Sequence, residues 1–536
     1  MSPLRVAVSN LLKKLRFPSS IAISSAIVTE NSSPISFSGK RFCQWYQTGQ
    51  YGWRQNLRDP CLWILISGHV VLTMGISANT AFAEDVTTET SSGNSANDDL
   101  NGLRKIEDGS VASNIHTAKW RVFTDKAREL FFEGKLDDAE RLFVAAIKEA
   151  KEGFGEQDPH VASSCNNLAE LYRVKKAFDK AEPLYLEAIK ILEESFGPDD
   201  VRVAVAVHNL GQFYIGQRML EKALVSYERA LKIKRRVLGY NHSECSDTMY
   251  QIGMVLYLQG KEKDAEIIIK DSISMLEKSG EGESIVCIRR LRSLSQIYLK
   301  SHRLDDAEMV QRKILNIMEF SKGWKSLDTV IAAESLALTL QASSETKQSK
   351  ELLERCLEVR RALLPGDHIQ IGANLLHLAR VAMLDFSQNK KLDVSRAKAE
   401  LGIAKDYLHN SIRIVRQCLD TILKQKDKSK KTSVRGHTSK EAQAALVILL
   451  QSLSTLSSLE LAKEELQEIQ KGDINVKAKE ALLQCIAAYN EFVVHKKSIA
   501  DYPEIKNEYL SCFKRAQSLL GNKLDGEGIQ KLNQTS

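Results

Sequence analysis

Small residues recur every 42 positions through the middle of the chain, among apolar residues spaced three and four apart. One column of small residues consists of Ala139, Ala181, Ala223, Ala265, Ala307 and Ser349. A second column lies twelve residues earlier in each unit and consists of Ala127, Ala169, Gly211, Gly253, Ser295, Ala337 and Ala379. Apolar spacing of three and four is typical of amphipathic helices, so each unit is predicted to hold two of them.

The size of the side chains in these columns indicates how the helices pack. Two helices approach closely only where their side chains are small, and the two columns supply such positions in every unit. A bulky column three residues after the second small column fills the remaining space: Leu130, Tyr172, Tyr214, Leu256, Tyr298 and Leu340. One helix pair cannot bury its apolar faces alone, whereas a stack of pairs can. The pattern therefore predicts an all-α solenoid of antiparallel helix pairs.

The segment "DPHVASSCNNLAELYRVKKAFDKAEPLYLEAIKILEESFG" resembles the tetratricopeptide repeats of the kinesin-light-chain type. That type has a 42-residue unit, an NNLAxLY first helix (helix A), an AExLYxxALxI second helix (helix B) and a glycine before the next unit. The glycine recurs here as Gly155, Gly197, Gly239 and Gly323. The resemblance covers about 120–385 and implies a right-handed superhelix over 113–385, with turns near 155, 197, 239, 281 and 323. Kinesin light chains also carry a heptad coiled coil, which 84–112 lacks, so only the repeat module carries over.

Residues 386–521 are predicted to form a helical extension that caps the apolar face of the last repeat. Helices are expected at 396–423, 440–469, 474–496 and 503–519. A solvated basic loop is expected at 424–440, and a disordered tail at 522–536.

The N-terminal region has the composition of a targeting sequence. Residues 1–83 carry eight basic and two acidic side chains, which account for most of the chain's net charge of +7. An amphipathic basic start and many serines predict a transit peptide over 1–60, mitochondrial with chloroplast as the alternative. Residues 61–83 form a hydrophobic anchor or a second, cleaved signal, followed by a flexible acidic linker over 84–112. The positive flank then places the repeats in the mitochondrial intermembrane space or at the inner membrane, or else at the thylakoid membrane or in its lumen.

The nine cysteines do not form a recognisable metal or disulfide pattern. None of them has CxxC spacing, and their number is odd. The spacing therefore argues against a disulfide framework and against a zinc site. Cys165 and Cys356 fall on apolar helix positions and are expected to be buried thiols.

The resemblance implies that helix A lines a concave groove through its fifth, ninth and twelfth positions, counting the second small column as the eighth. An extended peptide segment of a partner protein is the expected ligand. An acidic segment is favoured, because Arg173, Arg289 and Arg292 outnumber Glu170 there. The candidate groove residues are Asn166, Arg173, His208, Gln212, Tyr250, Tyr257, Arg289, Arg292 and Gln296.

Other function classes are not favoured by the sequence. No catalytic or nucleotide-binding motif is present, so we expect no enzyme activity, cofactor, metal or small-molecule substrate. The pairs Asn166/Glu170 and His208/Gln212 do not match the carboxylate clamp of chaperone-binding repeats. The alternative is an organellar helical-repeat RNA-binding factor, but such repeats are about 35 residues long and strongly basic. Nucleic acid is therefore not the expected partner, whereas membrane anchoring through 61–83 remains possible.

Overall fold

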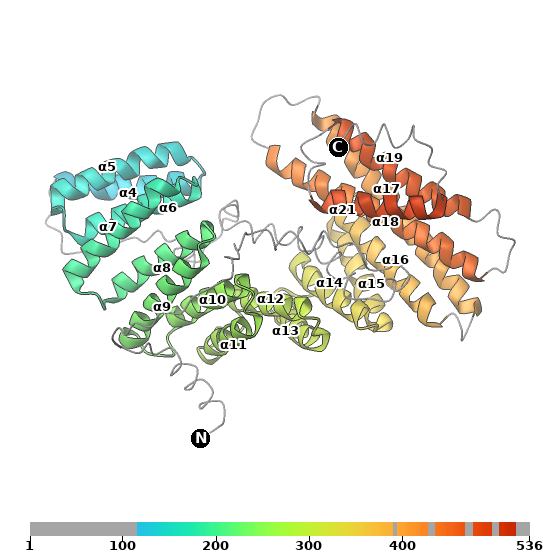
Figure 1. Cartoon of the computed structure of the whole chain (residues 1–536), viewed down its shortest axis with the longest axis horizontal. Helices are drawn as coiled ribbons and strands as arrows, with labels where there is room; N and C mark the ends of the chain where they lie inside the picture. Colours follow the sequence, from blue (N-terminus) through green and yellow to red (C-terminus); the bar gives the residue numbers. More distant parts are fainter. Residues whose placement is uncertain (1–114, 390–393, 427–434, 467–474, 496–502, 521–536) are drawn as a thin grey trace, which may run out of the picture. The chain divides into compact units, whose positions relative to one another are not determined.

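The computed structural model describes residues 115–389, 394–426, 435–466, 475–495 and 503–520 (Figure 1). Every secondary-structure element in these ranges is an α-helix, which confirms the all-α prediction. The predicted transit peptide, hydrophobic segment, acidic linker and C-terminal tail lie outside the described residues.

The repeat region consists of short helices in A–B pairs. The A helices are α4 (Ile115–Phe132), α6 (Pro159–Val174), α8 (Val201–Gly216), α10 (Ser243–Leu258), α12 (Ile285–Lys300) and α14 (Leu327–Ala342). The B helices are α5 (Leu136–Phe154), α7 (Phe178–Phe196), α9 (Leu220–Val237), α11 (Glu262–Lys278), α13 (Leu304–Lys322) and α15 (Thr346–Leu363). The five B helices from α5 to α13 therefore end close to the predicted turns.

The C-terminal region consists of α16 (Ile369–Asn389), α17 (Val394–Lys426), α18 (Arg435–Leu466), α19 (Asn475–His495) and α21 (Pro503–Leu520). These bounds agree with the predicted helices within a few residues, except that α18 begins earlier. The predicted basic loop over 424–440 is too long, because α17 and α18 both extend into it. At the end of α17 the helix continues through Lys424, Gln425 and Lys426, which have high helix propensity.

One segment among the described helices, Glu441–Lys463 of α18, is long and apolar enough to cross a membrane. The structure buries 72% of its most apolar window against neighbouring helices. A mostly buried helix of this kind is typical of a protein core, and α18 contributes to the core formed by α16, α17, α19 and α21.

The small columns lie where helices meet, as predicted. Ala169, Ala181 and Ala223 are fully buried. A Cβ atom added to Gly211 would lie 2.9 Å from the ring of Tyr227, and one added to Gly253 would lie 2.6 Å from Ile269 Cγ1. Both contacts are too short for a carbon side chain, so glycine at these positions allows the A and B helices of one pair to approach.

Two further columns repeat with the same 42-residue period. Each A helix from α6 to α14, and also α16, is preceded by a residue that acts as an N-cap. Its side chain accepts a hydrogen bond from the backbone amide two or three positions later. These residues are Asp158, Asp200, His242, Ser284, Ser326 and His368. The turn between helices A and B contains one residue with positive φ in each repeat: Gly134, Lys176, Arg218, Gly260, His302 and Ser344.

Tyrosines of the bulky column join three A helices, α6, α8 and α12, to the preceding B helix. The hydroxyl groups of Tyr172 and Tyr214 donate hydrogen bonds to Glu140 (3.0 Å) and Glu182 (2.9 Å), respectively. Tyr298 makes the equivalent bond to Glu266 at 3.2 Å. The bulky column therefore both fills space and links neighbouring repeats through the same hydrogen bond.

Candidate functional site: the A-helix face

The predicted groove residues lie in a row across consecutive A helices, which we call the A-helix face. Three hydrogen bonds join neighbouring helices along this row. Asn209 Nδ2 donates to Asn166 Oδ1 (3.1 Å), and Thr248 Oγ1 lies 3.3 Å from His208 Nδ1. Tyr250 and Ser293 share a hydrogen bond of 2.9 Å between their hydroxyl groups. The structure therefore brings α6, α8, α10 and α12 side by side through the positions that the sequence singled out.

At α6 the cation is already paired. Arg173 donates through Nε to Glu170 Oε2 at 2.9 Å, and Glu170 is completely buried. Burial lowers the pKa of Arg173, but the Glu170 carboxylate outweighs this and raises that pKa above its ordinary value. The hydroxyl of Tyr185 also donates to Glu170. Arg173 therefore neutralises a buried acid, so the excess of positive charge expected on this face rests on Arg289 and Arg292.

The middle of the A-helix face is polar and only partly exposed. Gln212 Nε2 lies 3.3 Å from His208 Nε2, one turn away on α8. The His208 ring meets the edge of Tyr227 at a centroid distance of 5.0 Å. Both side chains can exchange hydrogen bonds with a peptide backbone, and both are held in place by neighbours.

The face is most cationic at α12. Arg289, Arg292 and Gln296 follow one another at intervals of three and four residues, so they share one side of the helix. Both arginines are exposed, and neither side chain has a hydrogen-bond or ion-pair partner among the described residues. Partial burial lowers the pKa of Arg292, Asp328 raises it, and Arg289 lowers it further. Two like charges therefore stand together where an anion would stabilise both.

The two predicted tyrosines, Tyr250 and Tyr257, already contact other side chains of this chain, each in a different way. Burial raises the pKa of Tyr250, whose hydroxyl is used in the bond to Ser293. The ammonium group of Lys300 lies 4.5 Å from the ring centroid of Tyr257. Tyr250 therefore links two A helices, and Tyr257 already holds a cation of its own chain.

Sequence reasoning missed Arg290, a buried cation between the two exposed arginines. Its side chain is 1% exposed, and Nη1 donates to the backbone oxygen of Ser272 at 3.1 Å. It also donates to Ser246 and to Asp247 of α10. The equivalent positions of other repeats hold smaller residues, Ser164, Ala206, Thr248 and Ala332, so the arginine was a visible departure from the pattern. Arg290 fixes α12 against α10 and α11.

A second buried polar cluster lies between the repeats and α16. Arg360 donates two hydrogen bonds to Glu334, of 2.6 and 2.8 Å. Burial raises the pKa of Glu334, but Arg360 more than offsets this and holds it below its ordinary value. His377 of α16 lies nearby, is 1% exposed, and has no hydrogen-bond partner at either ring nitrogen. Burial lowers the pKa of His377 to about 4, which keeps the ring neutral.

One group among the described residues has the composition of a metal site. Ligand atoms of His116, Glu149 and Glu152 lie within 4.8 Å of one another. His116 Nδ1 is already 2.8 Å from Glu149, and Lys119 and Lys148 lie within 4.0 Å of the two carboxylates. Ion pairing on the surface of the first repeat accounts for this group.

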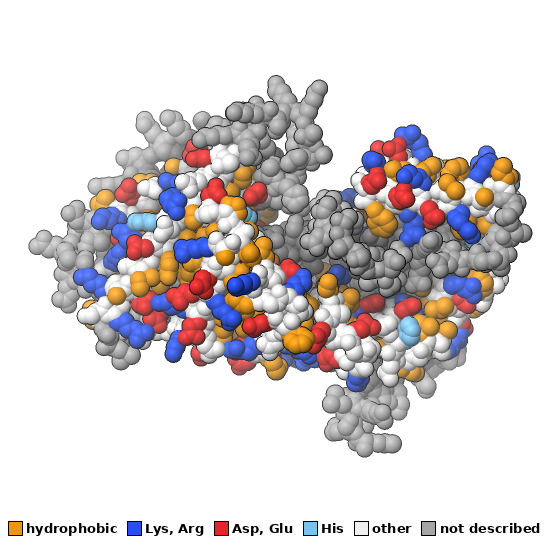
Figure 2. Space-filling view, turned by 180° about the vertical axis from the view of Figure 1, so that it is seen from behind, with side chains coloured by type: hydrophobic (Ala, Val, Ile, Leu, Met, Phe, Trp, Pro, Cys, Tyr) orange, Lys and Arg blue, Asp and Glu red, His pale blue; other side chains and the backbone are white. Residues whose placement is uncertain are grey.

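Charges of both signs are mixed on the face drawn in Figure 2, where Lys and Arg side chains alternate with Asp and Glu. A nucleic-acid interface would instead gather cations along one surface.

Comparisons with known proteins identify the repeats. Models of the tetratricopeptide repeat family match residues 166–236 and 202–278, and a further one matches residues 329–370. No curated protein sequence matches the chain.

Several solved structures are similar. One is a putative kinesin light chain from Podosopora anserina, whose own TPR-like repeats are nearly identical to one another. It is 16% identical to this chain, with a TM-score of 0.35, and the match covers 38% of this chain and 96% of that one. Another is BtubC from P. vanneervenii (17% identity, TM-score 0.35, covering 47% and 93%). The apo form of RapI aligns over 76% of this chain and 99% of its own (12% identity, TM-score 0.44). The family models therefore show tetratricopeptide repeats over residues 166–278 and 329–370, within the helix pairs that return every 42 residues.

Proposed function

We propose that this chain is a non-catalytic scaffold whose A-helix face binds an extended, acidic peptide segment of a partner protein. Tetratricopeptide repeats are protein-interaction modules, and the A helices α6, α8, α10 and α12 present amide, imidazole and guanidinium groups in one row. The observation that carries the proposal is the pair Arg289 and Arg292, exposed and unpaired among the described residues. Charge-assisted hydrogen bonds to such groups contribute about 1.5–3 kcal/mol each.

The path that we propose for the segment follows the row of A helices next to these arginines. Tyr250 and Ser293 join α10 to α12, so a peptide that reaches Arg292 also passes α10. Further along the row it would meet His208 and Gln212 on α8. The amide of Gln296, which has no hydrogen-bond partner among the described residues, can pair with the peptide backbone. An acidic side chain at Arg289 and Arg292 and backbone hydrogen bonds elsewhere would fix the register.

Photocross-linking from the intact chain identifies this ligand. A benzophenone amino acid in place of Gln296 should cross-link to a partner segment that contains acidic residues, mapped by mass spectrometry. The same group in place of Val225, an exposed residue of the B helix α9, serves as the control. Cross-links to the same segment from both positions would contradict binding at the A-helix face.

We also propose that the repeats act at or across an organellar inner membrane, with the mitochondrion ahead of the chloroplast. The proposal rests on the basic start of the sequence and on the uncharged stretch before residue 83. A fluorescent fusion to residues 1–83 should enter mitochondria. Protease should spare the repeats in intact mitochondria and digest them once the outer membrane is ruptured. Digestion only after full lysis would place them in the matrix instead.

A further inference from the structure

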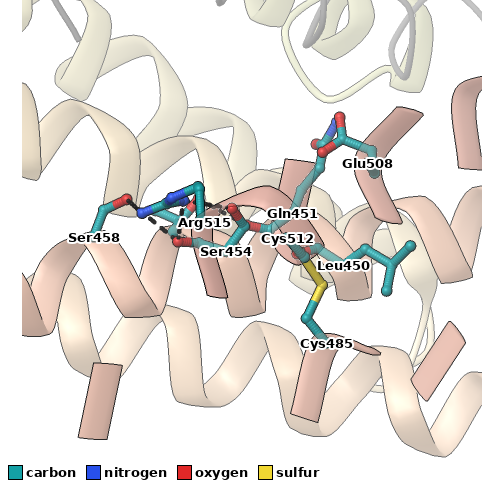
Figure 3. The surroundings of a disulfide bond; sticks show 9 residues. Leu450, Gln451, Ser454, Ser458, Cys485, Glu508, Cys512 and Arg515 are labelled. Carbon is teal, nitrogen blue, oxygen red and sulfur yellow. Dashed lines mark hydrogen bonds between the residues drawn. A yellow bond between two sulfur atoms is a disulfide. The ribbon is translucent and has the colours of Figure 1, made fainter. Parts of the chain in front are cut away.

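Helices α19 and α21 are joined by a disulfide bond between Cys485 and Cys512 (Figure 3). Their Cα atoms are 6.5 Å apart, and both side chains are completely buried. The two sulfur atoms lie 3.6 and 3.9 Å from the backbone oxygen of Leu450 in α18. Three helices therefore meet at this bond, and the expectation that the cysteines form no disulfide is wrong for this pair. Sequence spacing could not reveal it, because packing of α19 and α21 on α18 brings the residues together across 27 positions.

The other described cysteines are free thiols. Cys165, Cys245, Cys287 and Cys356 are buried, and Cys418 is partly exposed. Burial raises the pKa of Cys165 and of Cys356 to about 12, and a thiol with so high a pKa exchanges slowly. The expectation of buried thiols is confirmed for these two. Disulfide formation within the described residues is thus confined to one pair.

Helix α21 also makes a set of polar contacts that exist only when it lies on α18. Gln451 of α18 donates to Glu508 of α21 at 2.9 Å and accepts from Arg380 of α16 at 3.1 Å. Arg515 donates to the backbone oxygen of Ser454 at 3.0 Å and to the hydroxyl of Ser458 at 2.6 Å. In Figure 3, Leu450 lies beside the disulfide, and Ser454 and Ser458 lie at the guanidinium group of Arg515.

These contacts give α21 a defined role in the C-terminal region. Its apolar stripe is short, with Ile505, Cys512 and Ala516 as its fully buried members. Burial lowers the pKa of the Arg380 guanidinium, and the carboxyl group of Glu508 in α21 partly offsets this larger effect by raising it. A short helix with so few apolar anchors gains most from a covalent link, because the link restricts its detached states.

We propose that Cys485 and Cys512 are oxidised in the working protein, that the repeats therefore reside in an oxidising compartment, and that this bond fixes α21 to α19 and so keeps it packed on α18. Disulfides persist in oxidising compartments and are rare where thiols are kept reduced. The oxidant is the disulfide of a thiol oxidoreductase. Its S–S bond breaks as the Cys485–Cys512 bond forms, and its two sulfurs take up the two thiol protons. The proposal is independent of what the A-helix face binds.

The oxidation state can be measured on the full chain in its own cells. Acid quenching in denaturant, blocking of free thiols with N-ethylmaleimide, reduction, and labelling with deuterated N-ethylmaleimide separate the two classes of cysteine. Peptides with Cys485 and Cys512 should carry deuterated N-ethylmaleimide. Peptides with Cys356 and Cys418 should carry the undeuterated reagent. The undeuterated reagent on Cys485 and Cys512 would show them reduced and would overturn the proposal.

This role of the disulfide is tested by hydrogen exchange on the purified full chain. Reduction should speed exchange of the α21 amides at least tenfold and leave those of α6 to α13 unchanged. The variant Cys485→Ala/Cys512→Ala should show the fast rate with or without reductant, whereas Cys418→Ala should behave as the parent chain. Unchanged protection of the α21 amides after verified reduction would show that the disulfide does not hold α21 in place.

Discussion

The repeats from α4 to α15 and the helices from α16 to α21 bury their cores by different means. In the repeats each helix has 16 to 19 residues, the same small residues and N-caps return every 42 positions, and a tyrosine bond recurs at α6, α8 and α12. In the C-terminal region α17 and α18 have 33 and 32 residues, and a disulfide fixes the last helix. Repetition of one set of contacts stabilises an array. The end of an array needs contacts that occur only once.

The junction between the two regions should be the most sensitive point. Arg360→Leu leaves the buried Glu334 carboxylate without its partner and should cost about 3–5 kcal/mol in the free energy of unfolding. The double variant Glu334→Leu/Arg360→Leu should recover most of that loss, because no unpaired charge remains. Urea unfolding of the full chain measures both. Equal losses in the single and double variants would show that the loss comes from packing rather than from the unpaired charge.

Within the repeats the close approach of helices should be the next most sensitive feature. Gly211→Leu forces a side chain into the ring of Tyr227 and should cost about 3 kcal/mol, the upper part of the range for overpacking. Gly402→Ala in α17 is the control from the other region. No atom lies within 4 Å of the added Cβ there, so helix propensity should stabilise the chain by up to about 1 kcal/mol. An unchanged thermal midpoint for Gly211→Leu would show that Gly211 does not lie at a close contact between α8 and α9.

Acid should weaken the junction through His377. Its pKa is about 4 in the folded chain and about 6.5 when unfolded, so the unfolded state binds more protons between these values. Stability is present above pH 6.5 and falls as the pH drops toward 4. Burial is the main cause. Glu334 acts against it, and Arg380 and Arg360 add to it.

Lowering the pH from 7.5 to 5.5 should therefore cost about 1 kcal/mol through this residue. The variant His377→Leu should lose that share of the pH dependence in urea unfolding. It leaves no polar group unsatisfied, since both ring nitrogens lack partners. An unaltered pH dependence would mean that His377 is not neutral in the folded state.

The smallest effect concerns the positive-φ column of the repeats. Lys176 has φ of 59°, a conformation that is unfavourable for a residue with a Cβ atom. Lys176→Gly should relieve this strain and stabilise the chain by roughly 0.5–1 kcal/mol. Gly134→Ala, at φ of 76° in the same column, should destabilise it by about 1 kcal/mol. Thermal midpoints that shift in the same direction for both variants would contradict this assignment.

The sequence alone was enough for the helix pairs, because size and polarity repeat at the small and bulky columns. It was not enough for the N-cap column, since Asp158, His242 and Ser284 cap helices with different chemical groups. The positive-φ column was also hidden, because only Gly134 and Gly260 in it are glycines.

The sequence predicted which helix positions the candidate residues occupy, but it did not predict their ion pairs. Counting helix positions placed His208 and Arg292 on one face, because the repeat fixes the face of each helix. Counting could not show that Arg173 pairs with a buried acid, since Glu170 lies inward by packing rather than by spacing. Arg290 and the disulfide likewise depend on contacts between helices far apart in sequence.

The central claim is that Arg289 and Arg292 of the A-helix face bind an acidic segment. The most direct test is the affinity of the full chain for a labelled peptide with the cross-linked partner sequence, measured by fluorescence anisotropy. Arg289→Ala/Arg292→Ala should weaken binding tenfold or more without a change in thermal midpoint. Arg141→Ala/Lys148→Ala, with the same loss of charge on exposed positions of α5, should leave the affinity unchanged. Equal affinity of the Arg289→Ala/Arg292→Ala variant and the parent chain would contradict the claim.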